Sequence, residues 1–212
     1  MAESSPAPRP LYCPNKVGRI ALLSLEEILG HTGLNAVLNR AGLRHHTTNL
    51  PPNTLDPGFL LTDLSAMQQS LEDLYGPRGG RGLATRAGRA CFKYGLREFG
   101  PLLGLSDLAF RLLPLNMKIK VGAEALATTF NRYTEEMLEL EEYPEAFRVR
   151  VTRCPMCWGR HTDGPSCHLV VGVLQEALFW VSGGKNFLVE EIACAAAGDP
   201  ACVIHIARQP ID

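Results

Sequence analysis

The chain has 212 residues, of which 46% are hydrophobic, and its lysines and arginines (21) nearly balance its aspartates and glutamates (22). This length and composition suit one domain with a substantial apolar core. The net charge of -1 gives no electrostatic footprint for nucleic acid or for an anionic membrane surface. The apolar run Val170–Val181 is interrupted by Gln175 and Glu176, so the sequence predicts no membrane span.

The N-terminal segment 1–16 is polar and rich in proline, which predicts a disordered arm ahead of one domain over 17–212. The segment lacks the apolar core of a secretory signal peptide. We therefore expect a cytoplasmic protein with reduced thiols. In that compartment clustered cysteines favour a metal site over disulfides.

Helical patterns fill the first two thirds of the chain. Ser24 and Glu27 fit a capping box, which predicts a helix start at Ser24 with apolar residues from Leu25 to Leu38 on one face. Pro77–Gly80 lacks the lysine and hydroxyl residue of a phosphate loop and predicts a turn. The apolar spacing predicts further helices over about 62–75, 84–103, 106–113 and 114–137.

The pattern changes to alternating strands in the last third of the chain. Strands are expected at 138–143 and 147–153, and a helix is expected at 169–181. The segments 186–192 and 202–208 predict a hairpin, joined by a turn that contains Gly198, Asp199 and Pro200. Helices first and antiparallel strands later are typical of an α+β domain.

Five of the seven cysteines lie in this last part of the chain. Glu191 and Cys194 flank the end of one hairpin strand, and Cys202 begins the other, so the turn brings the three side chains together. Cys167 begins the preceding helix, which can deliver its thiol to the same place. Three thiolates and one carboxylate form a closed tetrahedral set, as in structural zinc sites. The alternative is a group of buried, inert thiols.

Cys154 and Cys157 form a CxxC pair just ahead of these residues. The chain has no second CxxC and no thioredoxin-like βαβ unit around this one, so interpretations as a zinc ribbon or a redox pair have little support. The pair can bind a second metal, replace Cys167 in the first site, or form a turn with partly buried thiols. His161 and His168 adjoin the cluster but are expected to lie outside the ligand set.

The C-terminal motifs CHLVVG, VEEIAC and AGDPAC resemble the 4-vinyl-reductase domain family. This family is related to the TRAPP and NO-signalling ligand-binding folds, and it includes the sensor domains of phenol-responsive bacterial activators and a protein of bacteriochlorophyll biosynthesis. Upstream, LEEILGHTGLNAVLNRAGL and RAGRACFKYGLREFG resemble helices of the same family. The resemblance extends over about 17–208.

The resemblance implies one structural zinc ion (Zn2+) held by Cys167, Glu191, Cys194 and Cys202. The Cys154–Cys157 pair is an addition relative to the phenol sensors. The resemblance also implies a homodimer that pairs through N-terminal helices, for which the apolar face starting at Leu25 offers a surface.

Two functions from different classes follow. The first is a sensor or carrier domain, not catalytic by itself, that holds a small apolar, aromatic or tetrapyrrole ligand between the middle helices. The alternative is a vinyl reductase acting on a divinyl chlorophyllide, although the sequence has no GxGxxG motif to bind a nicotinamide cofactor. An iron–sulfur centre is disfavoured because the chain lacks a compact ferredoxin-like cysteine run. The residues expected to line the ligand pocket are aromatic, at spacings that are also typical of core: Phe92, Tyr94, Phe99 and Phe110.

Overall fold

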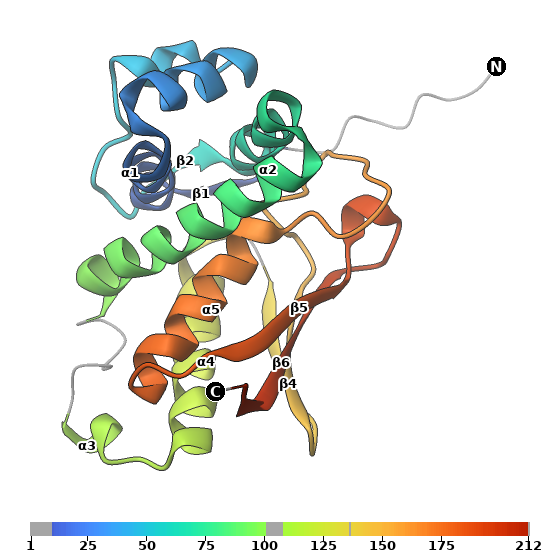
Figure 1. The fold of residues 1–212 in the computed structure, drawn as a ribbon. Coiled ribbons are helices and arrows are strands. Elements are labelled where there is room, and N and C mark those ends of the chain that lie inside the picture. Colours follow the sequence, from blue (N-terminus) through green and yellow to red (C-terminus); the bar gives the residue numbers. More distant parts are fainter. Residues whose placement is uncertain (1–9, 101–107, 136, 212) are drawn as a thin grey trace.

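The computed structural model describes residues 10–100, 108–135 and 137–211. Two layers are visible in Figure 1, where α4 and α5 lie along a sheet and α1 and α2 lie above them. The helices are α1 Asn15–Arg40, α2 Leu61–Phe99, α3 Leu108–Arg111, α4 Leu115–Tyr133 and α5 His168–Ser182, with short 3-10 helices η1 Arg44–Thr47 and η2 Ala195–Ala197. The strands are β1 Tyr12–Pro14, β2 Pro57–Leu60, β3 Leu138–Glu142, β4 Ala146–Val151, β5 Phe187–Ala193 and β6 Cys202–Pro210.

Ordered structure begins ahead of residue 17. β1 pairs antiparallel with β2, with Cys13 opposite Phe59, and both side chains are buried. Residues 10–16 are therefore part of the fold and not of the arm expected to end at residue 16, because their apolar side chains pack into the core. Residues 1–9 lie outside the described part of the chain.

The first helix begins at Asn15, so the predicted start at Ser24 is wrong. Ser24 is fully buried within α1, and its hydroxyl donates a hydrogen bond to the Ile20 carbonyl oxygen at 2.7 Å. Leu25 and Leu38 are also buried in the core of the chain. The apolar face that we expected to support dimerisation is therefore covered within the monomer.

The second long helix is interrupted at one glycine. Gly76 has φ 73° and ψ 164°, a conformation that only glycine adopts readily, and Pro77 begins the next helical segment. The turn expected at Pro77–Gly80 is instead the first turn of that segment. Over the described residues, no helix of the chain is long and apolar enough to cross a membrane.

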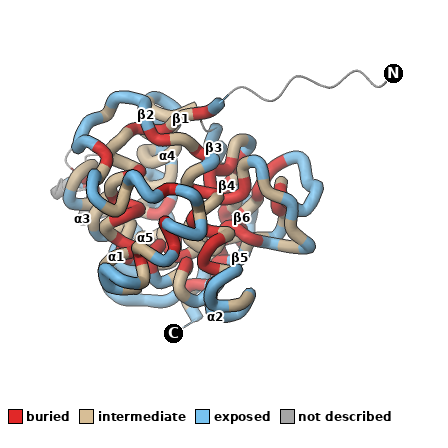
Figure 2. The backbone as a smooth tube through the Cα atoms, turned by 90° about the horizontal axis from the view of Figure 1, so that it is seen from above, coloured by how far each residue is buried: buried red, intermediate tan, exposed pale blue. Residues whose placement is uncertain are grey.

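Four antiparallel strands form the main sheet, in the order β3-β4-β6-β5. The pairing places Val151 opposite Cys202, and Glu191 opposite Ile204. One face carries the buried side chains Val149, Ile204 and others, and Figure 2 shows the buried stretches of β4, β5 and β6 in the interior. The predicted α+β class, with a helical N-terminal half and an antiparallel sheet, is confirmed.

Two glycines allow α2 and α5 to cross in backbone contact. A Cβ atom on Gly88 would overlap the Leu169 carbonyl oxygen, and one on Gly172 would overlap the Thr85 carbonyl oxygen. Small residues at a crossing let helix backbones approach closely. This contact fixes the position of α5, whose first turn adjoins the cysteine cluster.

Candidate functional site

The four predicted zinc ligands converge at one end of the sheet. Cys202 is the first residue of β6, Glu191 lies near the end of β5, and Cys194 directly follows that strand. Cys167 occupies the N-cap position of α5, which begins over the same end of the sheet. The four ligand atoms all lie within 4.8 Å of one another, so these donors can share one metal ion.

The CxxC pair joins the same cluster. Cys154, Cys157, Cys167 and Cys202 form a second group whose ligand atoms lie within 4.8 Å of one another. The Sγ atoms are 3.2 Å apart for Cys154 and Cys167, 3.3 Å for Cys157 and Cys202, and 3.6 Å for Cys167 and Cys202. All five cluster cysteines, including Cys194, are unbridged and at most 4% exposed. The structure thus brings the four expected ligands and the two additional thiols into one cluster.

One oxygen of the Glu191 carboxylate has a partner and the other has none. Oε2 accepts a hydrogen bond from the Cys167 backbone N–H at 2.7 Å. Oε1 is buried and has no hydrogen-bond partner within the described structure. Burial raises the pKa of Glu191 to about 7. A cation beside Oε1 would satisfy this oxygen and favour the carboxylate form.

The buried thiols influence one another's protonation. Hydrogen bonding with Cys154 lowers the pKa of Cys157 and raises the pKa values of Cys167 and Cys202. Like charges this close cannot all form unless a cation neutralises them. Metal binding would release the thiol protons, as it does in other thiolate sites.

Backbone and side-chain donors surround the cluster. The Ala195 N–H donates to the Cys202 Sγ at 3.3 Å, and the Ser166 hydroxyl lies 3.5 Å from the Cys194 Sγ. The Asp199 carboxylate accepts a hydrogen bond from the Cys194 N–H at 2.8 Å, which fixes the turn. Such supporting contacts orient metal ligands.

The loop between Cys154 and Cys167 is anchored to α2. Arg160, whose side chain is 6% exposed, forms an ion pair with Glu72 at 2.9 Å. The Ser65 hydroxyl donates to the Trp158 carbonyl oxygen at 2.8 Å. These contacts hold the CxxC pair over the end of the sheet.

The two neighbouring histidines lie outside both groups of ligands. His161 is exposed, and His168 is partly buried, which lowers its pKa. Neither belongs to a group of donors that can hold a metal.

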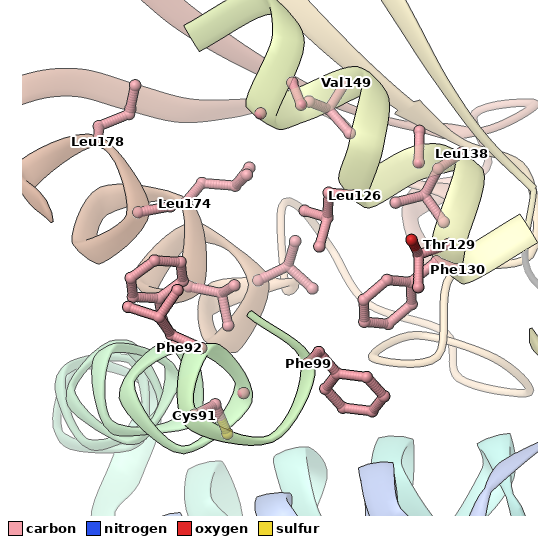
Figure 3. Close-up of a pocket in the computed structure, with 18 of the residues that line it drawn as sticks. Cys91, Phe92, Phe99, Leu126, Thr129, Phe130, Leu138, Val149, Leu174 and Leu178 are labelled. Atoms are coloured by element: carbon pink, nitrogen blue, oxygen red, sulfur yellow. The ribbon is translucent and has the colours of Figure 1, made fainter. Parts of the chain in front are cut away.

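An apolar cavity of about 250 Å³ lies between the helices and the inner face of the sheet. Figure 3 shows side chains from α2, α4, α5 and the strands pointing into it. Phe92, Phe99 and Phe110, three of the predicted pocket residues, line the cavity. Sequence reasoning missed most of the wall, including these side chains: Leu126, Phe130, Leu138, Val149, Leu174 and Leu178.

Tyr94, the fourth predicted pocket residue, lies outside the cavity. Its hydroxyl hydrogen-bonds with Glu27 on α1, which raises the pKa of Tyr94, and the Arg97 guanidinium lies over its ring at 5.0 Å. Helical periodicity explains the difference from the expectation, because Tyr94 is two residues from Phe92 and faces another side of α2.

Few polar atoms line the cavity, and one of them is a thiol. Cys91 points into the cavity from α2, and burial raises its pKa to about 11. Trp180 closes part of the wall, with its ring 6.2 Å from that of Phe92 and 6.4 Å from that of Phe110. The thiol is neutral at physiological pH, so the cavity suits an uncharged ligand.

The cysteine cluster and the cavity share one loop. Cys154 and Cys157 belong to the cluster, while the residues between them, Pro155 and Met156, line the cavity. A ligand in the cavity would therefore contact the same four-residue turn that supplies two of the thiols.

Comparison with known proteins agrees with the predicted family and fold. The model of the 4-vinyl-reductase domain matches residues 147–208, the segment that contains most of β4, the cysteine loop, α5 and the hairpin. This match confirms the resemblance noted in the C-terminal motifs. Curated proteins provide no significant match to the chain.

Solved structures with a similar fold are H-NOX proteins. A variant of the Tt H-NOX protein has a TM-score of 0.60 at 12% identity, covering 94% of this chain and 97% of that one. The S. oneidensis H-NOX protein in the Fe(II)NO ligation state has a TM-score of 0.58 at 13% identity, covering 90% and 99%. The Fe(II) unliganded H-NOX protein of K. algicida has a TM-score of 0.58 at 10% identity, covering 94% and 98%. At these identities the likeness shows the fold, which agrees with the NO-signalling-like fold expected from sequence.

Proposed function

We propose that this chain is a small-molecule-binding domain, a sensor or carrier, whose ligand is an uncharged apolar or aromatic compound held in the cavity. The observation that carries the proposal is the cavity itself. It measures about 250 Å³ and is enclosed by side chains from α1, α2, α4, α5 and the sheet. Largely apolar pockets with few polar groups are typical of ligand sites.

The size of the cavity favours a compact ligand. Pockets for drug-sized ligands measure about 300–1,000 Å³, and an apolar cavity of about 150 Å³ binds benzene. The volume here, about 250 Å³, lies between these limits and suits a molecule of one or two rings. Phe92 and Phe110 offer aromatic faces for such a ring.

Haem, which the titles of H-NOX structures describe, does not fit the residues of this cavity. Haem iron takes an axial histidine, cysteine, methionine or tyrosine. Over the described residues no histidine or tyrosine lines the cavity, which leaves Met156 and the neutral thiol of Cys91. Lys118 is the one cation of the described wall, whereas haem carries two carboxylates. The same arguments of size and charge favour a compact aromatic ligand over a tetrapyrrole.

The metal in the proposed function is structural zinc. Cys167, Glu191, Cys194 and Cys202 would hold it in a closed set that joins α5 to the hairpin. A closed set leaves no position for substrate, so we propose that the chain is not catalytic by itself. Multiple turnover of a divinyl chlorophyllide with NADPH by the pure chain would contradict this.

Calorimetric titration with benzene, p-cresol, naphthalene and haem tests the ligand class. We expect 1:1 binding of the one- and two-ring compounds and none of haem. Phe92→Ala should weaken p-cresol binding, because it removes a ring from the wall, while the zinc content stays unchanged. Tyr94→Phe is the matched control, because Tyr94 lies outside the cavity. Absence of binding by every ring compound would overturn the proposal.

The cytoplasmic location, the single domain over 17–212 and the homodimer are further proposals. The buried, unbridged cysteines of the cluster support a reducing compartment. Light scattering over a range of concentrations tests the dimer, and a monomer mass at high concentration would contradict it.

A further inference from the structure

We propose that the cysteine cluster holds two zinc ions, bridged by the thiolates of Cys167 and Cys202. The inference rests on the metal site of the proposed function and adds a second metal to it. Its ligands are the CxxC pair, which a single-zinc site leaves without a role.

The two groups of donors share two members. One group is Cys154, Cys157, Cys167 and Cys202, and the other is Cys167, Glu191, Cys194 and Cys202. Two four-coordinate metals require eight ligand positions. Six side chains supply eight positions when two thiolates each bind both metals. The shared residues Cys167 and Cys202 are therefore the bridging ligands.

The sulfur positions agree with this arrangement. Zinc–sulfur bonds of about 2.3 Å in a tetrahedron place neighbouring sulfurs about 3.8 Å apart. The proposed bridging pair, Cys167 and Cys202, has an Sγ–Sγ distance of 3.6 Å. Each bridging sulfur also lies near one sulfur of the CxxC pair, Cys154 at 3.2 Å from Cys167 and Cys157 at 3.3 Å from Cys202. Small side-chain adjustments bring these distances to the tetrahedral value.

The carboxylate and the charge support the second ion. Glu191 Oε1 is buried without a hydrogen-bond partner in the described structure, as expected for an oxygen that binds a metal. Five thiolates and one carboxylate carry six negative charges when ionised. One zinc ion bound by the four cysteines of the first group would leave Cys194 and Glu191 without a metal. Two zinc ions employ all six donors and neutralise four of the six charges.

Native mass spectrometry of the zinc-saturated full chain, together with elemental analysis, tests the number of metals. We expect two zinc ions per chain. Cadmium-113 NMR of the cadmium-substituted protein should show two resonances, one for a sulfur-only site and one for a site with an oxygen ligand. A single zinc at saturation would overturn the bridged centre and leave the proposed function standing. Absence of bound metal would overturn both, and an iron–sulfur absorption spectrum would overturn the zinc assignment.

Single substitutions separate terminal from bridging ligands. Cys157→Ser and Cys194→Ser each remove a terminal ligand and should leave one zinc ion. Cys202→Ser removes a bridging ligand and should lose both ions together. Cys91→Ala, outside the cluster, should retain two. If Cys157→Ser binds as much zinc as the unaltered protein, the bridged arrangement is wrong. The metal count of the unaltered chain decides the question even where a variant fails to fold.

Discussion

The cysteine cluster and the apolar cavity lie at adjoining places in one fold but are encoded differently. The cluster comprises six side chains, most of them brought together by one hairpin and the residues that adjoin it. The cavity wall is apolar and comes from five helices and the sheet, with contributions from Val17 to Ile206. Chemically distinctive residues at short spacing identify the first region, whereas only the assembled fold reveals the second.

The two regions are nevertheless connected through α5 and the CxxC loop. α5 begins beside Cys167 and lines the cavity with Leu174 and Leu178. Pro155 and Met156 line the cavity between two cluster cysteines. Sites that share structural elements influence each other's binding energies reciprocally. Removing the metal should therefore weaken ligand binding, whereas blocking the cavity should leave the metal in place.

The largest expected effect is loss of the metal centre. Cys202→Ser should abolish zinc binding and lower the free energy of unfolding by several kcal/mol, a large part of the about 5–15 kcal/mol typical of a domain. Zinc analysis and chemical denaturation measure the two effects. Cys91→Ala is the control and should keep its metal. Unchanged stability after zinc loss would show that the metal does not staple the fold.

The next effect is at the helix crossing that serves both regions. Gly172→Ala places a methyl group against the Thr85 carbonyl oxygen and should destabilise the chain by about 3 kcal/mol. Gly82→Ala is a matched control on α2, because nothing lies within 4 Å of its Cβ position. It should stabilise the chain by up to about 1 kcal/mol through helix propensity. Thermal unfolding distinguishes the two, and equal melting temperatures would contradict the close crossing.

The cavity itself can be blocked without touching the cluster. Ala123→Phe adds a ring to the α4 wall and should reduce the affinity for p-cresol by at least about tenfold, with unchanged zinc content. Glu124→Phe places the same ring on the exposed side of α4 and should have no such effect. Calorimetry on both variants provides the comparison. Equal affinities would place the ligand elsewhere.

The sequence predicted the sheet and four of the candidate ligands because their information is local. Glu191, Cys194 and Cys202 lie on one hairpin, and strand pairing forces them together. The role of Cys154 and Cys157 stayed open because their loop is positioned by the contact between Arg160 and Glu72, far apart in the sequence. Long-range pairs of this kind leave no pattern in a single sequence.

The cavity and the N-terminal boundary were less predictable for a related reason. An apolar side chain that lines a cavity has the same spacing as one that packs in a core, as the different positions of Phe92 and Tyr94 demonstrate. The polar, proline-rich start of the chain concealed a short strand, because the burial of Cys13 depends on its partner Phe59. These features depend on packing and not on local composition.

The smallest expected effect compares thiols in the two environments. Burial in apolar surroundings raises the pKa of Cys91 to about 11 from its ordinary value of 9.0, so its thiol stays protonated at pH 8. Because the thiolate is the reactive form, alkylation by iodoacetamide at pH 8 should be about 100-fold slower than for an unperturbed cysteine. The rate should continue to rise about tenfold per pH unit towards pH 11, whereas an ordinary thiol levels off near pH 9. Peptide mapping by mass spectrometry separates Cys91 from the cluster cysteines, which bound metal should protect at every pH in this range. Bound p-cresol should slow the Cys91 reaction further, because it occupies the same cavity. A rate that levels off near pH 9, or that p-cresol does not change, would show that Cys91 does not lie in an enclosed ligand site.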